Sequence, residues 1–379
     1  MIRLTVPSID ESDLQIVREV MESGYLVQGT YVQKFEETIA KYVDSNYAVA
    51  VSNCTAALQL SLLATDLQPD DIVIVTAYSY PATANVIELV GGRPVFVDID
   101  PDTFNMDPNC LADMLKKIFS IRENAKKVKV ILPVHTFGQM ADMPAILEIS
   151  DRYNVAVVED AACALGAAIG RKSAGVWGTI GCFSFHPRKA ITTGEGGMVV
   201  TSNSNLVNRI RALRNHGLDP ESPSPDFIMA GFNYRMTEFQ AGLGLAQMAK
   251  LDRIISKRRQ LADYYSEAFR DTVITPPISI PNFQHVFQSY VVLLPLEISS
   301  QRSELISDLR HEGIETTIGT WHIPMTTYYR QRYGYKPGDF PNADEIFSRS
   351  LTIPLYESLT NELQTEVIDK LTSWVTRRI

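Results

Sequence analysis

The stretch SFHPRKAITTGEGG, residues 184–197, decides how we interpret the fold, because it sets a single lysine between an apolar strand and a glycine-rich turn. Apolar residues 180–185 lead up to Lys189, and the glycines of residues 194–197 let the backbone approach a bulky ligand closely. Burial and cationic neighbours lower the pKa of a lysine, so we expect a neutral amine that can form an imine with an aldehyde. The alternative is a solvated surface charge, the usual state of a lysine.

The composition bounds the class of protein. The 379 residues, 45% of them hydrophobic, exceed one ordinary core, so we expect two domains or one large one that can bury an active site. The 35 Lys and Arg against 44 Asp and Glu give a formal charge of -9. That balance argues against the broad basic surface of a nucleic-acid binder, while local cationic pockets remain compatible with it.

The four cysteines, Cys54, Cys110, Cys163 and Cys182, are widely spaced and form no C-x-x-C pair. Their spacing suggests neither a zinc site nor a disulfide framework, and a reducing compartment fits best. The N-terminal residues have no apolar signal-peptide core, and no apolar run approaches the roughly 18 residues of a spanning helix. We expect a soluble, cytoplasmic protein with no metal site, no nucleic-acid partner and no membrane partner.

Hydrophobic periodicity predicts helices over residues 10–21 and 32–43, followed by short β-rich runs that alternate with helical segments. The expected strands cover residues 47–51, 72–76, 94–97, 128–134, 155–158, 180–185 and 198–201. This alternation is typical of an α/β fold with a mainly parallel sheet covered by helices. Ligands are expected at the carboxyl ends of such strands.

The rest of the chain predicts a second, smaller unit. A long helical stretch over residues 237–269 precedes the proline-bearing segment 275–281, which resembles a domain boundary, although the boundary could lie tens of residues earlier. We divide the chain into a large domain of residues 1–250 and a small α+β domain of residues 251–379. The expected elements of the small domain are a strand over residues 289–294 and helices over residues 301–311 and 361–375.

Two acidic residues end the apolar run VAVVED, residues 155–160, which places a carboxylate at the carboxyl edge of the sheet. Asp160 is the better candidate for a cofactor contact. A pyridoxal phosphate ring needs a carboxylate beside its pyridine nitrogen, because the protonated nitrogen makes the ring an electron sink. The alternative is that Asp160 caps a following helix.

The segment NCTAA, residues 53–57, joins a strand to an apolar helix, and the free amides at that helix start could hold a phosphate. Thr55 adds a hydroxyl, and Ser184 could supply another. Small residues are also common helix caps, so this signal alone leaves both roles open. The chain has neither a G-x-G-x-x-G fingerprint nor a Walker loop, which disfavours a dinucleotide or P-loop enzyme.

Two further strand ends carry candidate side chains. Tyr80, in YSYPAT (residues 78–83), could stack on a planar cofactor or pack in the core. His135, in PVHTFG (residues 133–138), could contact a ligand or make a structural hydrogen bond.

Taken together, these segments resemble the DegT/StrS-type nucleotide-sugar aminotransferase family, whose members are fold-type I pyridoxal phosphate enzymes. The resemblance covers nearly the whole chain. Besides the segments above it rests on SGYLVQG (residues 23–29), NCTAAL (residues 53–58), EDAA (residues 159–162), GFNYRMTE (residues 231–238) and HIPMTTYY (residues 322–329).

The resemblance implies a role for each matching residue. Lys189 would form the internal aldimine and then shuttle protons, while Asp160 would pair with the pyridine nitrogen. The residues implied to hold the phosphate and the ring are Thr55, the amide of Ala56, Ser184 and Tyr80, with Asn233 reaching the phosphate from the neighbouring subunit of an obligate homodimer. Cys163 departs from the commoner pattern, in which Gln or His contacts the ring hydroxyl.

The implied function is an aminotransferase that moves an amino group from L-glutamate to a nucleotide-linked keto-sugar of the 3- or 4-keto, 6-deoxy type. The cofactor would be pyridoxal 5'-phosphate, with pyridoxamine 5'-phosphate as the form that carries the nitrogen, which predicts ping-pong kinetics. The product would serve amino-sugar biosynthesis for a surface polysaccharide or a secondary metabolite. The sugar nucleotide is expected near His322, Tyr328, Tyr329 and Arg330, with Arg332 as an alternative to Arg330.

Three other classes remain open. A cyclitol (inosose) aminotransferase would use the same cofactor residues without a nucleotide site. A pyridoxal phosphate-binding regulator would lack turnover and would need a nucleic-acid contact surface. A nicotinamide oxidoreductase shares the α/β pattern but lacks its glycine fingerprint here.

Overall fold

A seven-stranded sheet forms the centre of the computed structural model, which describes residues 1–379. Its strand order is β1-β10-β9-β6-β5-β2-β4. The strands are β1 (Tyr47–Val51), β2 (Ile72–Thr76), β4 (Arg93–Val97), β5 (Val128–Leu132), β6 (Ala156–Asp160), β9 (Ile180–Ser184) and β10 (Gly197–Thr201). All neighbours pair in parallel except β10, which is antiparallel to both β1 and β9. The predicted α/β fold with a mainly parallel sheet is confirmed.

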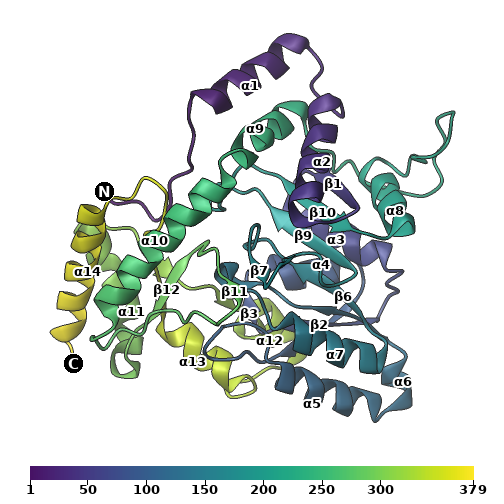
Figure 1. Ribbon diagram of the computed structural model, residues 1–379. Helices are drawn as coiled ribbons and strands as arrows, with labels where there is room; N and C mark the ends of the chain where they lie inside the picture. Colours follow the sequence, from purple (N-terminus) through teal and green to yellow (C-terminus); the bar gives the residue numbers. More distant parts are fainter.

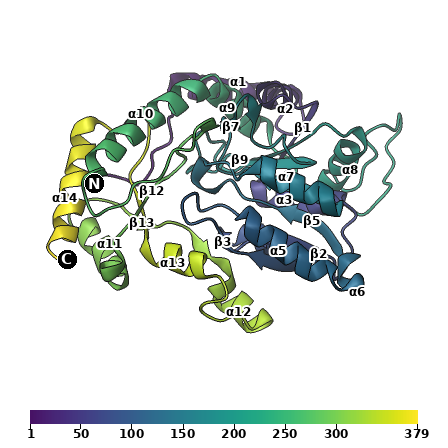
Figure 2. The ribbon, with the colours of Figure 1, turned by 60° about the horizontal axis from the view of Figure 1, so that its bottom comes forward.

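The strands are mostly apolar, as expected for a sheet whose two faces are both covered by helices. In β2, Ile72 and Ile74 pack into one hydrophobic core, and Val73 and Val75 pack into the core on the opposite face. Figure 2 shows α5 (Pro108–Phe119) and α7 (Met143–Tyr153) side by side on one face, close to the short helix α6 (Arg122–Ala125). The opposite core contains residues of α3 (Cys54–Ala64), α4 (Ala82–Leu89) and α8 (Ser204–Arg214).

The N-terminal helices α1 (Glu11–Ser23) and α2 (Thr30–Val43) pack against α9 (Glu238–Met248) at the top of Figure 1. The next helix, α10 (Leu251–Phe269), runs from there toward the left of the view. The helical stretch predicted over residues 237–269 is interrupted between α9 and α10. At the break, the Lys250 amine donates to Ser8 O and to the carboxylates of Asp10 and Asp13, so contacts with the N-terminal segment hold this lysine.

A second, three-stranded sheet lies toward the C-terminus, with the order β12 (Tyr290–Leu293), β15 (Ser350–Ile353) and β13 (Thr317–Ile318). Together with α10, α11 (Arg302–His311) and α14 (Asn361–Thr376) it encloses a third core, drawn from Ile2 and residues 261–375. These helices group at the left of Figure 1, beside both chain ends. The three elements predicted for this region are confirmed.

Part of the C-terminal region returns to the large sheet. Residues of α12 (Thr327–Tyr333) and α13 (Pro341–Arg349) belong to the same core as α3, and β14 (Trp321–His322) pairs with β3 (Tyr78–Ser79). The division into residues 1–250 and 251–379 therefore stays a prediction, since residues 321–347 contact both regions. The remaining short elements are β7 (Ala168–Ile169), β8 (Lys172–Ser173) and β11 (Phe283–Gln284), with short 3-10 helices at Thr136–Gly138, Leu296–Gln301 and Ile323–Met325.

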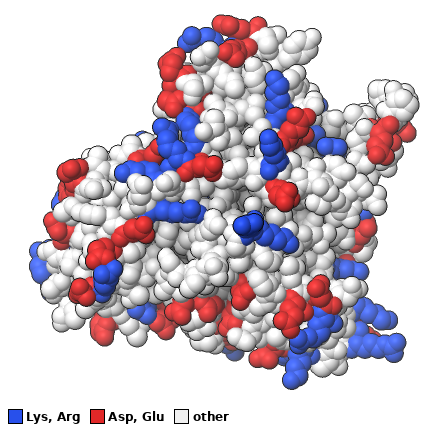
Figure 3. Space-filling model, viewed as in Figure 1, with Lys and Arg blue, Asp and Glu red and all other residues white.

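The surface carries both signs of charge. On the face drawn in Figure 3, Lys and Arg side chains lie among Asp and Glu side chains rather than in one continuous basic area. No helix combines the length and the apolar character needed to cross a membrane.

Candidate active site

Asp160, Lys189 and the start of α3 meet where the central strands β6, β9 and β1 end. Asp160 ends β6 and is in register with Cys182 of the neighbouring strand β9. Lys189 lies in the loop between β9 and β10, and Gly197, at the start of β10, pairs with Val51 just before α3. A Cβ atom on Gly197 would lie 2.5 Å from the backbone of Asn53, so this glycine lets the start of α3 approach the lysine loop.

The Asp160 carboxylate is buried and held from two sides. Its Oδ2 accepts a 2.7 Å hydrogen bond from the Thr83 hydroxyl, and its Oδ1 accepts a 3.1 Å bond from the amide of Ala162. The residues that follow Asp160 form turns, not a helix, so the helix-cap alternative is not realised. Thr83 has no role in the sequence-based prediction, although it ends the segment that contains Tyr80.

Lys189 is partly buried, and its Nζ donates a 3.0 Å hydrogen bond to the Cys163 sulfur. Burial acts to lower the pKa of Lys189, but Cys163, Cys54 and Asp160 together outweigh it, so this pKa is raised above its ordinary value. The expected lowering of this pKa is therefore wrong for the cofactor-free chain. The expectation counted burial and missed the acidic side chains that surround the amine. The amine points at a thiol rather than at solvent.

The start of α3 offers two unengaged backbone donors. Asn53 caps the helix, and its Oδ1 accepts a 2.8 Å bond from the amide of Ala56, which was the predicted phosphate donor. The amides of Cys54 and Thr55 have no acceptor, and the Thr55 side chain is exposed. Sequence patterns at helix starts predict this cap, but they do not say which amide the cap occupies.

The other predicted cofactor residues differ in exposure. Tyr80 is 67% exposed, so its ring is available to stack rather than packed in the core. The Ser184 hydroxyl is partly buried and accepts a 3.4 Å bond from the amide of His186. Asn233 is exposed, and its Oδ1 accepts from Arg235 Nε at 3.0 Å.

His135 has a structural role. Its Nε2 lies 2.9 Å from Glu159 Oε2 inside the protein, and its Nδ1 accepts from the amide of Ala141 at 3.2 Å. Glu159 also accepts three backbone amides from the loop after β8, those of Gly175, Trp177 and Gly178. Of the two acids that end β6, Glu159 therefore holds the scaffold together and Asp160 faces the site.

The residues predicted for the sugar nucleotide do not form one exposed cluster. Tyr329 is 1% exposed, and its hydroxyl donates to Asn85 at 2.8 Å. His322 is also buried, with Nε2 3.1 Å from Asp344 Oδ1, and burial lowers its pKa. Tyr328 is half-exposed.

Charged side chains lie next to that segment. Arg330 is exposed, and Arg332 forms an ion pair with Glu88 at 3.1 Å. Glu88 also accepts a hydrogen bond from the Tyr333 hydroxyl at 2.5 Å. The Glu88 carboxylate therefore already pairs with the positive charge of Arg332, which a diphosphate would need.

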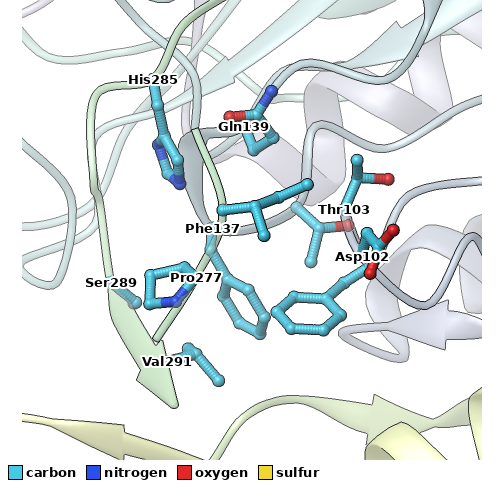
Figure 4. A pocket seen from close by; sticks show the side chains of 11 residues that line it. Asp102, Thr103, Phe137, Gln139, Pro277, His285, Ser289 and Val291 are labelled. Carbon is cyan, nitrogen blue, oxygen red and sulfur yellow. The ribbon is translucent and has the colours of Figure 1, made fainter. Parts of the chain in front are cut away.

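A separate small cavity lies between the loops that carry Phe104 and Phe137 and the segment of residues 277–291 (Figure 4). Its volume is about 10 Å³, which is about the size needed for one water molecule and far too small for a cofactor. The amide group of Gln139 and the hydroxyl of Thr136, both lining residues, have no hydrogen-bond partner, which suits a bound water.

Comparison with known proteins identifies this arrangement. The family model described as the DegT/DnrJ/EryC1/StrS aminotransferase family matches residues 7–372. The chain belongs to this family. The predicted resemblance is confirmed, and the protein is an aminotransferase of a family whose members depend on pyridoxal phosphate.

Individual relatives agree with the family match. The chain is 37% identical over 319 residues to GDP-perosamine synthase from Caulobacter vibrioides, covering 83% of each protein. It is 35% identical over 383 residues to the spore coat polysaccharide biosynthesis protein SpsC from Bacillus subtilis, covering 96% of this chain and 95% of the relative. Among solved structures, the putative sugar aminotransferase Spr1654 from Streptococcus pneumoniae in its PLP form superposes with a TM-score of 0.91 and 26% identity, over 99% of both chains.

Proposed function

We propose that this protein transfers an amino group from L-glutamate to a nucleotide-linked keto-sugar, using pyridoxal 5'-phosphate held by the residues at the carboxyl edge of the sheet. The observation that carries the proposal is the meeting of Asp160, Lys189 and the start of α3 at that edge. A carboxylate, a primary amine and free backbone donors are the three groups that a phosphorylated pyridine aldehyde requires.

The residues present fit this cofactor. When bound, pyridoxal phosphate supplies an electron sink and carries the amino group between the two substrates. Asp160 would hold the proton on the ring nitrogen, because a buried carboxylate favours a cation beside it. The amides of Cys54 and Thr55 point from the positive end of α3, which favours the phosphate.

Lys189 would bind the cofactor covalently and then move a proton at the reacting carbon of each substrate. Tyr80, with its exposed ring, would cover one face of the cofactor and exclude water from it. Ser184 and the Thr55 hydroxyl would complete the phosphate contacts. The exposed Asn233 would reach the phosphate of a second copy of this chain, so the working form would be a homodimer with shared sites.

The names of the chain's relatives support a sugar nucleotide as the substrate. Its relatives include a protein named GDP-perosamine synthase and one named for spore coat polysaccharide biosynthesis. We therefore propose a nucleotide-linked 3- or 4-keto, 6-deoxy sugar as acceptor, and amino-sugar biosynthesis for a surface polysaccharide or a secondary metabolite as the role.

Nitrogen-labelled L-glutamate tests the proposal directly. The purified protein, pyridoxal phosphate, the labelled donor and a panel of nucleotide-linked keto-sugars are mixed, and labelled amino sugar is measured by mass spectrometry. Lys189→Ala should lower the transfer rate at least about a hundredfold, the usual scale of a lost proton-transfer group. Asp160→Ala should also lower the rate, because it removes the carboxylate that favours the protonated ring nitrogen. Lys172→Ala, which removes an exposed lysine on β8, should leave the rate unchanged.

The outcomes separate the alternatives. Labelled product from an inosose but from no keto-sugar would assign a cyclitol aminotransferase. Failure of L-glutamate to change the bound cofactor's visible absorbance would exclude it as donor. Undiminished transfer by Lys189→Ala would overturn the proposal as a whole.

A further inference from the structure

The backbone around Lys189 is held mostly by bonds within its own loop, residues 186–191. The amide of Lys189 donates to His186 O at 2.8 Å, and the amide of Arg188 donates to His186 Nδ1 at 3.2 Å. These residues form turns and bends rather than part of a helix or a strand. The loop therefore lacks the regular hydrogen-bond ladder that fixes the strands on either side of it.

One hydrogen bond ties the backbone of this loop to a distant segment. Nε2 of Gln288 donates to Arg188 O at 2.8 Å, across 100 positions of the chain. Apart from the contact between the Lys189 amine and Cys163, no other hydrogen bond joins residues 186–191 to another part of the protein. The Arg188 carbonyl belongs to the peptide bond that leads into Lys189. Because a peptide bond is planar, holding its oxygen also fixes the point from which the lysine side chain starts.

Gln288 is itself held by bonds at its backbone and at its side chain. Its backbone amide donates to Phe137 O at 2.9 Å, and its carbonyl oxygen accepts from Arg258 Nη1 at 3.0 Å. Its side-chain oxygen accepts a 3.2 Å bond from the Ser289 hydroxyl, which directs Nε2 toward the lysine loop. A Cβ atom on Gly138 would lie 3.1 Å from the Gln288 nitrogen, so the backbones pack closely here.

Arg258, on α10, anchors this segment to the C-terminal part of the protein. Its side chain is buried, and Nη1 also donates to Phe287 O at 3.1 Å and to Leu355 O at 3.4 Å. A buried cation that loses such acceptors is left unpaired, which is costly, so these carbonyl positions are strongly maintained. Gln288 thus connects a rigid part of the structure to a loop that has few other ties.

We propose that Gln288 is a positioning residue for Lys189, because it holds the backbone from which the reactive amine extends. Gln288 acts through the Arg188 carbonyl and needs no contact with cofactor or substrate. Small displacements of a reacting group lower reaction rates steeply, so the placement of this backbone matters for the lysine. The hydrogen bond belongs to the structure itself, whereas its value for amino transfer rests on the proposed function.

The contribution of Gln288 should be greatest during the reaction. When the Lys189 amine engages an aldehyde, it leaves the Cys163 sulfur that it contacts in the cofactor-free chain. The bond from Gln288 is then the remaining hydrogen bond that holds residues 186–191 from outside the loop.

The contact is tested first by hydrogen exchange in the cofactor-free, full-length protein. Gln288→Leu keeps the size of the side chain and removes the donor. Amides in the peptide covering residues 186–191 should exchange about two- to tenfold faster, the scale of one lost hydrogen bond. Gln288→Glu, which keeps the polar shape and lacks the donor, should show the same increase. Gln288→His retains a ring N–H donor and should exchange close to the wild-type rate.

Gln284→Leu is the matched control. Gln284 lies in the same segment, and its Nε2 also donates to a backbone oxygen, that of Gly170 at 2.9 Å. That bond is remote from the lysine loop, so its loss should leave exchange in residues 186–191 unchanged. Wild-type exchange of this loop in both Gln288→Leu and Gln288→Glu would overturn the proposal.

The effect on Lys189 is tested by cofactor attachment. Covalent attachment of pyridoxal phosphate to Lys189 is trapped with borohydride and measured by mass, and it should slow about two- to tenfold in Gln288→Leu. Pyridoxamine phosphate carries an amine in place of the aldehyde and cannot attach to the lysine. Its dissociation constant should stay unchanged, because Gln288 does not bind the cofactor. A general distortion of the site would instead weaken both processes, and that result would overturn the positioning role.

Steady-state transfer assays complete the test. Gln288→Leu should lower kcat and leave KM for both substrates unchanged, since the variant misplaces the amine without removing a substrate contact. A raised KM with unchanged kcat would assign Gln288 to substrate binding and overturn the positioning role. Faster loop exchange in an enzyme whose wild type transfers no amino group would leave the contact standing and refute the proposed function alone.

Discussion

The hydroxyl of Thr83 donates a 2.7 Å hydrogen bond to Oδ2 of Asp160, and both side chains are buried. Thr83 lies in the first turn of α4, so this bond ties the carboxylate expected to face the cofactor ring to the helix that connects β3 to β4. A hydrogen bond to a charged group contributes about 1.5–3 kcal/mol, enough to fix the orientation of the carboxylate.

Thr83→Val should therefore weaken cofactor binding at least about tenfold, because it keeps the shape of the side chain and removes the donor. Thr83→Ser keeps the hydroxyl and should stay close to the wild type. Equilibrium titration of the cofactor-free protein with pyridoxal phosphate measures both. If the valine variant binds as tightly as the serine variant, the orientation of Asp160 does not depend on this bond.

Asn53→Asp separates the helix cap from the phosphate site. Aspartate caps a helix as well as asparagine does, so the free energy of unfolding should change little. The added negative charge beside the amides of Cys54 and Thr55 should weaken binding of pyridoxal phosphate about tenfold and leave binding of unphosphorylated pyridoxal unchanged. The ratio of the two dissociation constants is the measurement, and equal losses for both ligands would place the phosphate elsewhere.

The sheet could be predicted from the sequence because its strands are short apolar runs between helices. The runs over residues 47–51 and 72–76 coincide with β1 and β2, and the other five strands agree to within two residues at each end. The placement of Asp160 and Lys189 at the same end of the sheet also follows from the order of elements, since parallel strands have their carboxyl ends on the same side.

Contacts between distant residues could not be predicted in this way. Lys250, at the break between α9 and α10, bonds to Asp13, which is 237 positions away, and the continuous helical pattern gives no sign of this contact. The three thiols near the active site, those of Cys54, Cys163 and Cys182, show no spacing that suggests proximity, and their approach depends on strand order. The same holds for the raised pKa of Lys189, because its causes come from three different elements.

Glu238 provides a further stability test. The start of α2 has no local side-chain cap, and the Glu238 carboxylate instead accepts the amides of Gly29, Tyr31 and Val32 at 2.8–2.9 Å. Glu238→Ala leaves three donors unpaired and should lower the free energy of unfolding by about 3 kcal/mol. Glu238→Gln, which keeps one acceptor, should lose less.

Urea denaturation measures this loss, with Glu37→Ala as the matched control. Glu37 is an exposed carboxylate on α2 that bonds only to Gln33, so its removal should change stability by less than about 0.5 kcal/mol. Equal stability of the Glu238 and Glu37 variants would show that water replaces the distant cap.

The buried imidazole of His285 should make the protein sensitive to acid. Burial, with a smaller contribution from Arg259, lowers the pKa of His285 to about 3, while an unfolded chain binds that proton near pH 6.5. Its contribution to stability is complete above about pH 6.5 and is lost as the pH falls toward 3, at about 1.4 kcal/mol per pH unit. Between pH 7.5 and 5 the wild type should thus lose about 2 kcal/mol through this group.

His285→Asn removes the titrating ring and keeps an acceptor for the amide of Phe287, which the Nδ1 atom of His285 binds at 2.9 Å. The variant should be less stable than the wild type at pH 7.5 but should lose about 2 kcal/mol less on acidification to pH 5. Urea unfolding at fixed protein concentration measures both, since the stability of the proposed homodimer would depend on concentration. His311→Asn, at an exposed helix end, is the control and should retain the wild-type loss. An identical loss in the wild type and in His285→Asn would show that the His285 ring is protonated in the folded protein.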